Sequence, residues 1–71
     1  MRLHRHPYVE IFIVQEGHAS FTVGPSTIDV IAPRTLVAQA NVPHGFVNVG
    51  DGRLKQVDIH LSPTFITEWL S

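Results

Sequence analysis

Residues 4–17 have the sequence His-Arg-His-Pro-Tyr-Val-Glu-Ile-Phe-Ile-Val-Gln-Glu-Gly and combine a β-rich segment with the potential metal ligands His4, His6 and Glu10. The part Tyr8–Val14 is dense in β-branched and aromatic residues, which predicts a strand. Side chains alternate between the two faces of a strand, so residues of equal parity point the same way. If this strand extends back to His4, the side chains of His4, His6 and Glu10 project from one face. The segment therefore predicts a strand that carries a cluster of potential ligands.

Short β-rich segments separated by turn residues follow along the rest of the chain. Further strands are predicted at Ala19–Val23, Thr27–Ile31, Thr35–Ala38, Gly45–Val49 and Leu54–Leu61. The turns expected between the strands contain Gly, Pro or Asn and lie at Gln15–His18, Gly24–Ser26, Pro33–Arg34, Asn41–Pro43 and Gly50–Gly52. This pattern is typical of an all-β sandwich or barrel. No linker or repeat divides the chain, so we expect a single domain over residues 1–71.

The C-terminal segment has a different pattern, which predicts a short helix. Ser62 is a suitable N-cap, and Pro63 suits the first helical position. Four apolar residues then share one face at helical spacing: Phe65, Ile66, Trp69 and Leu70. We expect a helix of about two turns that packs onto the barrel or docks on a neighbouring subunit.

The composition is that of a small globular protein. A chain of 71 residues hides only about 60% of its unfolded surface on folding, so a metal, disulfides or a partner subunit usually stabilises it. There is no Cys, which excludes disulfides and fits a reducing cytosol. Apolar residues make up 44% of the chain, charged residues 15%, and the net charge is −1. This balance excludes a disordered chain and offers no basic patch for nucleic acid.

The sequence also lacks the features of a membrane or exported protein. The longest apolar runs, Ile11–Val14 and Val30–Ala32, are far too short to cross a bilayer. The start of the chain lacks the charged and then apolar pattern of a signal peptide. We therefore expect a cytoplasmic protein without a membrane partner or a nucleic-acid partner.

Five His against five Lys and Arg together suggest a metal site. His44 belongs to another strand, and pairing that strand beside the first would bring His44 opposite His4, His6 and Glu10. A lone carboxylate in an apolar interior costs several kcal/mol, whereas a divalent cation favours ionised Glu and neutral imidazoles. Three nitrogens and one oxygen leave one or two positions open for water or substrate. The set suits Fe, Mn, Ni, Co, Cu or Zn and does not choose among them.

These residues carry a family resemblance. The spacing H-x-H-x3-E-x6-G from His4 to Gly17 resembles the first motif of the cupin family without its leading Gly. Pro43–Asn48 has the pattern P-H-x3-N, which resembles the end of the second cupin motif. The resemblance covers nearly the whole chain and implies an all-β jelly-roll barrel, the double-stranded β-helix. It also implies that one divalent transition metal is held by four ligands: His4, His6, Glu10 and His44.

The chain departs from the usual pattern of small cupins in two places. The second motif usually opens with Gly-Asp and carries a Pro before its Gly, where this chain has Pro33–Arg34, Gln39 and Asn41. Asn tolerates positive φ better than most residues, so we still expect a turn at Asn41. Cupins of this type also have strands before the first motif, whereas only Met1–Leu3 precede it here. We therefore expect a barrel that does not close easily alone.

Several residues near the ligands are candidates for a substrate pocket. Tyr8 and Phe12 share the ligand face, and Phe46 shares the parity of His44, so each fills the core or contacts a small molecule. Asn48 either supports His44 or caps the end of its strand.

Two further His have surface interpretations. His18 follows a turn and is expected to be exposed. His60 has the parity of Gln56 and Asp58, the polar face of its strand, which favours a surface or interface position over a ligand role.

Two classes of function remain open. The cupin resemblance implies enzymes that act on small polar molecules, including dioxygenases, isomerases, epimerases and lyases. An open-sided metal can polarise a substrate oxygen, or bind O2 if it is iron. Tyr8 is the one nearby acid or base candidate apart from Glu10. The alternative is a non-catalytic, metal-dependent module that senses or stores a small ligand, and the fold does not choose between the two.

The predicted strand Tyr8–Val14 also suggests a homodimer. Its two faces are both apolar, and the outer row of Val9, Ile11 and Ile13 needs a cover. Missing leading strands would leave an unpaired sheet edge as well. A two-fold dimer satisfies both needs, with or without exchange of strands. The alternative cover within one chain is the predicted C-terminal helix.

Overall fold

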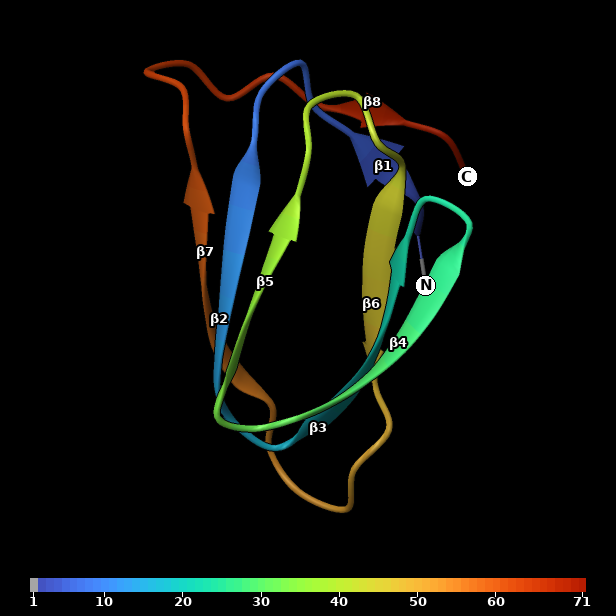
Figure 1. Cartoon of the computed structure of the whole chain (residues 1–71), viewed down its shortest axis with the longest axis vertical. Coiled ribbons are helices and arrows are strands. Elements are labelled where there is room, and N and C mark those ends of the chain that lie inside the picture. Colours follow the sequence, from blue (N-terminus) through green and yellow to red (C-terminus); the bar gives the residue numbers. More distant parts are fainter. Residues whose placement is uncertain (1) are drawn as a thin grey trace.

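The computed structural model describes residues 2–71, which form short strands and no helix (Figure 1). The strands are β1 (His4–Arg5), β2 (Glu10–Glu16), β3 (His18–Val23), β4 (Ser26–Ile31), β5 (Arg34–Ala38), β6 (His44–Asn48), β7 (Lys55–His60) and β8 (Glu68–Trp69). Without a helix, residues 2–71 also contain no helical segment able to span a membrane.

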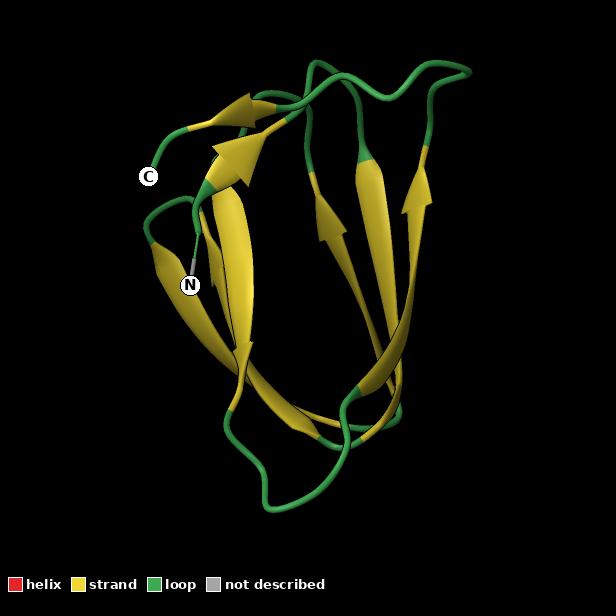
Figure 2. Cartoon of the chain, turned by 180° about the vertical axis from the view of Figure 1, so that it is seen from behind, coloured by secondary structure: helices red, strands yellow, loops and turns green. Residues whose placement is uncertain are grey.

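The strands form two antiparallel sheets that face each other (Figure 1). The larger sheet has the order β4-β3-β6-β1-β8, and the smaller sheet has the order β5-β2-β7. Seen from behind in Figure 2, the two layers converge at the lower end and separate toward the upper end, near which the C-terminus lies. This all-β arrangement is consistent with the jelly roll expected from the sequence.

Apolar side chains fill the space between the sheets. The buried ones are Phe12, Val14, Ala19, Phe21, Val30, Leu36 and Ala38. In β2, Glu10, Phe12 and Val14 are buried, while Ile11 and Ile13 on the other face are only partly covered. The predicted parity of this strand is therefore confirmed.

The predicted strands match those observed after β2 to within one residue at each end. The first prediction, Tyr8–Val14, is shifted, because β2 begins at Glu10 and ends at Glu16. The assumption that this strand reaches back to His4 is wrong. Pro7 has no N–H to donate and interrupts the ladder, so residues 6–9 leave the larger sheet after β1 and cross to the smaller one.

The predicted C-terminal helix is absent, and the segment forms strand β8 instead. Ser62 closes a local turn with Thr64, because its Oγ donates to the Thr64 carbonyl and accepts from the Thr64 N–H. Further along, β8 pairs with β1, and the Leu70 N–H donates to the Leu3 carbonyl at 2.8 Å. An isolated helix of two turns is marginal in water, whereas pairing with β1 satisfies backbone groups of both segments.

Two turns depend on positive φ angles. Gly17 has φ +99° between β2 and β3, and Asn41 has φ 65° before β6. The expected turn at Asn41 is therefore confirmed. At Gly17, a Cβ would lie 2.5 Å from the carbonyl oxygen of Arg53, which is closer than real Cβ contacts allow.

The Gly17→Ala variant is therefore expected to lose about 1–3 kcal/mol of unfolding free energy, from the strained φ and from displacement of the Arg53 backbone. Thermal unfolding followed by circular dichroism measures the loss. Gly52→Ala is the matched control, because nothing lies within 4 Å of a Cβ added at Gly52. Equal melting temperatures for the two variants would contradict this account of the turn.

The outer surfaces of the two sheets differ in polarity. On the larger sheet, β3 and β4 present Ser20, Thr22, Thr27 and Asp29 beside one another. On the smaller sheet, β7 turns its apolar residues outward, because Asp58 and His60 pair with the inward-facing Phe12 and Glu10. The result is an exposed surface that we name the outer apolar face. It consists of Ile11, Ile13, Val37, Val57 and Ile59.

Candidate metal centre

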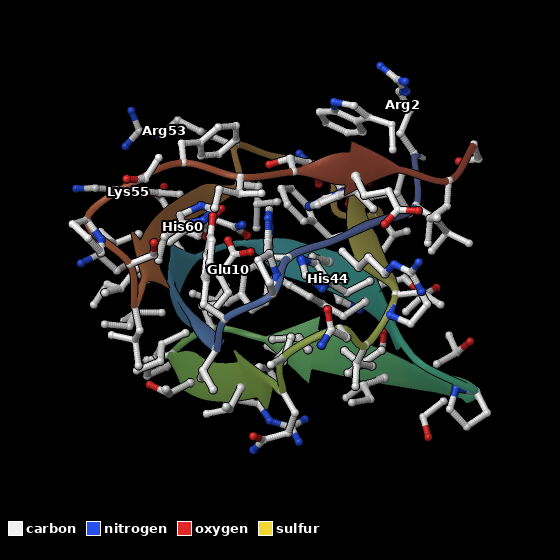
Figure 3. All side chains as sticks on the ribbon, turned by 90° about the horizontal axis from the view of Figure 1, so that it is seen from above. Arg2, Glu10, His44, Arg53, Lys55 and His60 are labelled. Atoms are coloured by element: carbon white, nitrogen blue, oxygen red, sulfur yellow. The ribbon has the colours of Figure 1, made fainter. Side chains whose placement is uncertain are left out.

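Four ligand-type side chains converge between the sheets. Figure 3 shows two of them, Glu10 and His44, in the interior of the molecule. His4 comes from β1, His44 from β6, Glu10 from the facing strand β2, and His6 from the crossover between β1 and β2. Each residue offers one donor atom, and these atoms all lie within 4.8 Å of one another. His6, Glu10 and His44 are each only 2% exposed.

Strand pairing explains the convergence. β1 and β6 are antiparallel neighbours in which His4 lies directly opposite His44, and the two rings meet edge to face at 4.5 Å. Glu10 reaches the same space from the other sheet because its parity is that of the core residues of β2. His6 is in no strand, yet its ring stacks on Tyr8 at 4.9 Å and turns inward.

Each imidazole has one nitrogen fixed by the backbone. Nδ1 contacts a carbonyl oxygen in all three: His4 with Arg2 at 3.3 Å, His6 with Ile66 at 2.8 Å, and His44 with Val42 at 3.0 Å. A neutral imidazole that donates from Nδ1 has a free lone pair on Nε2, which is the usual arrangement of metal-binding histidines. Burial lowers the pKa of His4, which favours its neutral form.

The inward-facing nitrogens of His6 and His44 both lie close to one oxygen of Glu10. His6 Nε2 lies 2.9 Å from Glu10 Oε1, but the angles do not form a hydrogen bond, so this buried nitrogen has no partner among the described residues. His44 Nε2 lies 3.0 Å from the same oxygen. A buried polar atom without a partner costs about 1–3 kcal/mol. A divalent transition metal would accept these lone pairs, so the residues present fit such an ion.

Opposing effects set the charges in the cluster. Burial alone would raise the pKa of the Glu10 carboxyl, but the hydrogen bond from His44 and the charges of His60, His44 and His6 outweigh it and lower that pKa. Burial alone would lower the pKa of His44, but hydrogen bonds with Glu10 and the Val42 carbonyl outweigh it and raise that pKa. These shifts favour an ionised Glu10 beside the protonated form of His44, and a metal would compete with the proton on His44.

A cavity of about 160 Å³ adjoins the cluster. It is lined by His4, His6, Glu10, Phe12, Phe46, Asp58, His60, Phe65, Thr67 and Trp69. Phe12 and Phe46, two of the predicted pocket residues, thus border this space together with three of the four proposed ligands. A larger hollow of about 610 Å³ lies at the other end of β2, but its lining brings no cluster of ligands together.

Two other residues predicted near the site, Tyr8 and Asn48, are not among the residues that line this cavity. The Tyr8 hydroxyl lies 2.7 Å from His60 Nδ1, so Tyr8 reaches the site through His60. Asn48 lies at the far end of β6, where it accepts from the Gly50 N–H and donates to the Gly52 carbonyl. This matches the second of the two roles considered for Asn48, the cap at the end of its strand.

A family model described as a cupin domain, Cupin_2, matches residues 1–60. The chain belongs to the cupin family. Searches of curated proteins and of solved structures found no match. In this cupin, residues 61–71 lie outside the family match, yet they supply three walls of the cavity, Phe65, Thr67 and Trp69. The Ile66 carbonyl that fixes His6 comes from the same segment.

His60 and Asp58 are the site residues that sequence reasoning missed. The predicted surface position of His60 is wrong, because β7 faces the core with its polar residues, and the His60 side chain is 26% exposed beside Glu10. The prediction that His60 is not one of the ligands agrees with the cluster, which does not include it. Asp58 keeps an exposed edge, but burial raises its pKa and the charge of Glu10 raises it further. Only the pairing of β7 with β2 reveals this orientation. His18 meets its expectation, since its ring contacts Asp29 on the outer surface.

Proposed function

We propose that this cupin holds one divalent transition metal through His4, His6, Glu10 and His44 and uses it to bind a small polar molecule in the adjoining cavity. The observation that carries the proposal is the convergence of three imidazoles and one carboxylate, with an unpartnered buried nitrogen, beside that cavity. Fe, Mn, Ni, Co, Cu and Zn are all compatible with this donor set.

The cavity limits the size of the ligand. Its volume of about 160 Å³ is well below the roughly 300–1,000 Å³ of sites for drug-sized molecules. Four protein ligands would leave one or two coordination positions of the metal free for the bound molecule. A bound metal would supply Lewis-acid polarisation of a ligand oxygen.

Polar groups on the wall favour catalysis over simple storage. Asp58 and His60 face the cavity beside the metal ligands, and groups of this kind exchange protons with a bound substrate. The alternative function, a non-catalytic sensor or storage module, is supported by the aromatic part of the wall. That part consists of Phe12, Phe46, Phe65 and Trp69.

Metal analysis tests the proposal directly. The chain is purified without added metal, its metal content is measured by mass spectrometry, and the stripped protein is titrated with each candidate ion. We expect one equivalent per chain. Oxygen uptake and the binding of small polar acids and sugars are then compared between loaded and stripped protein. A chain that binds none of the six ions would refute the function.

We also propose that a second copy of the chain covers the outer apolar face. Val37, Val57 and Ile59 are 39–48% exposed there. The helix considered as an alternative cover does not form, and the C-terminal segment pairs with β1 in the other sheet. Exposed apolar patches of this kind mark interaction sites, and a two-fold dimer lets one patch cover another.

The Val57→Asp variant is therefore expected to be monomeric, because a charge on the outer apolar face opposes its burial. Sedimentation at micromolar concentration should give a wild-type species of twice the 7.9 kDa chain mass. Val47→Asp is the matched control on the larger sheet, since Val47 is 43% exposed and Val57 is 44% exposed. A wild-type monomer at these concentrations would refute the dimer.

A further inference from the structure

The two oxygens of Glu10 have separate partners. Oε1 lies 2.9 Å from His6 Nε2 and 3.0 Å from His44 Nε2. Oε2 points the other way and lies 3.3 Å from Nε2 of His60. Figure 3 shows Glu10 between His60 on one side and His44 on the other. One carboxylate oxygen thus faces the ligand cluster, and the second faces His60.

Tyr8 contacts the other ring nitrogen of His60, Nδ1. The Tyr8 oxygen accepts the Ile66 N–H at 3.4 Å and lies 2.7 Å from His60 Nδ1. A hydroxyl that donates its own proton to Nδ1 leaves the N–H of the imidazole on Nε2, the nitrogen that lies 3.3 Å from Glu10 Oε2. The opposite tautomer would place a lone pair of His60 against the carboxylate. The Tyr8 ring is held by its stacking on His6, with an interplanar angle of 11°.

We propose that His60, oriented by Tyr8, is a positioning residue that holds Glu10 with Oε1 alone facing the metal. The inference rests on the proposed metal function. Carboxylates bind metals through one oxygen or through both, and the His60 ring nitrogen held 3.3 Å from Oε2 competes with the ion for that oxygen. A metal position that a two-oxygen Glu10 would fill thus stays open toward the cavity, which His60 also lines. Partners of this kind change metal affinity by about 10–100-fold when removed.

Cobalt loading tests the arrangement. Co²⁺ affinity is measured by competition with a chelator, and the visible spectrum of the Co²⁺ form reports the coordination number. We expect His60→Ala to bind Co²⁺ at least about tenfold more weakly and with an altered spectrum. His60→Gln retains an N–H donor near the position of Nε2 and should restore much of the wild-type spectrum.

The Tyr8→Phe variant separates positioning from a general structural role. Tyr8 acts through His60, so the Tyr8→Phe/His60→Ala double variant should match His60→Ala instead of adding a second loss. His18→Ala is the matched control, because His18 also contacts a carboxylate, Asp29, but on the outer surface. We expect it to leave affinity and spectrum unchanged.

The outcomes distinguish this inference from the proposed function. A wild-type chain that binds no metal overturns both. A wild-type chain that binds Co²⁺, with a His60→Ala variant of equal affinity and identical spectrum, overturns the positioning role alone. If His60→Ala does not fold, the comparison of His60→Gln and Tyr8→Phe with wild type decides in the same way.

Discussion

The His6→Ala/His44→Ala variant is expected to bind a divalent metal at least about a thousandfold more weakly than the wild-type chain. Four-ligand zinc sites contribute about 10–16 kcal/mol of binding free energy. If the ligands share it evenly, two of them account for about 5–8 kcal/mol, and each 1.4 kcal/mol is about a factor of ten. Isothermal titration of stripped protein, with metal content determined by mass spectrometry, measures the loss.

His18→Ala is the control for this loss, because His18 lies on the outer surface beside Asp29. Circular dichroism must show that the double variant is folded, since both replaced imidazoles are buried. One full equivalent of tightly bound metal in the folded double variant would place the site elsewhere in the chain.

A strong chelator should lower the melting temperature of the metal-loaded chain by at least about 15 °C at pH 8. A ligand present at a thousand times its dissociation constant stabilises the folded state by about 4 kcal/mol. In a domain of this size each kcal/mol shifts the melting temperature by about 4–8 °C. Thermal unfolding with and without chelator measures the shift, and an unchanged melting temperature would show that the metal contributes nothing to stability.

The difference in melting temperature between the metal-loaded and the stripped chain should shrink on acidification, because protons compete with the metal for His44. The pKa of His44 is raised above 6.5 in the folded chain, so its contribution to the metal-free fold is fully present below pH 6.5 and disappears as the pH rises through the raised pKa. Glu10 has a lowered pKa, so its contribution is present above pH 4.5 and is lost only as the pH falls through the lowered value. His44 and Glu10 therefore both stabilise the stripped protein between about pH 4.5 and 6.5. In this range the extra stability of the metal-loaded form should be smallest.

The parity of β2 could be predicted from the sequence because one face of that strand packs in the core. Glu10, Phe12 and Val14 are buried as expected. The positions of His4 and His6 were predicted for a reason that does not hold, since Pro7 ends the pairing of that segment. His4 reaches the site through its pairing with His44, and His6 through the bond between its Nδ1 and the Ile66 carbonyl.

The errors have a common cause in contacts between distant parts of the chain. The spacing of Phe65 and Trp69 is helical, but the partner of this segment is β1, more than sixty residues away in the sequence. The alternating polar residues of β7 indicate a face turned to solvent, but the pairing of β7 with β2 turns His60 inward. Local patterns contain no information on which strand becomes a neighbour, so neither contact could be found from them.

The pairing of β1 between β6 and β8 also determines when the site exists during synthesis. His4 and His6 are made first, but their partners follow about forty and sixty residues later: His44 opposite His4, and Ile66 and Trp69 against their rings. A chain still growing at residue 60 has every proposed ligand but lacks the carbonyl that orients His6. The arrangement that would hold the proposed metal is therefore complete only once the chain extends through Trp69.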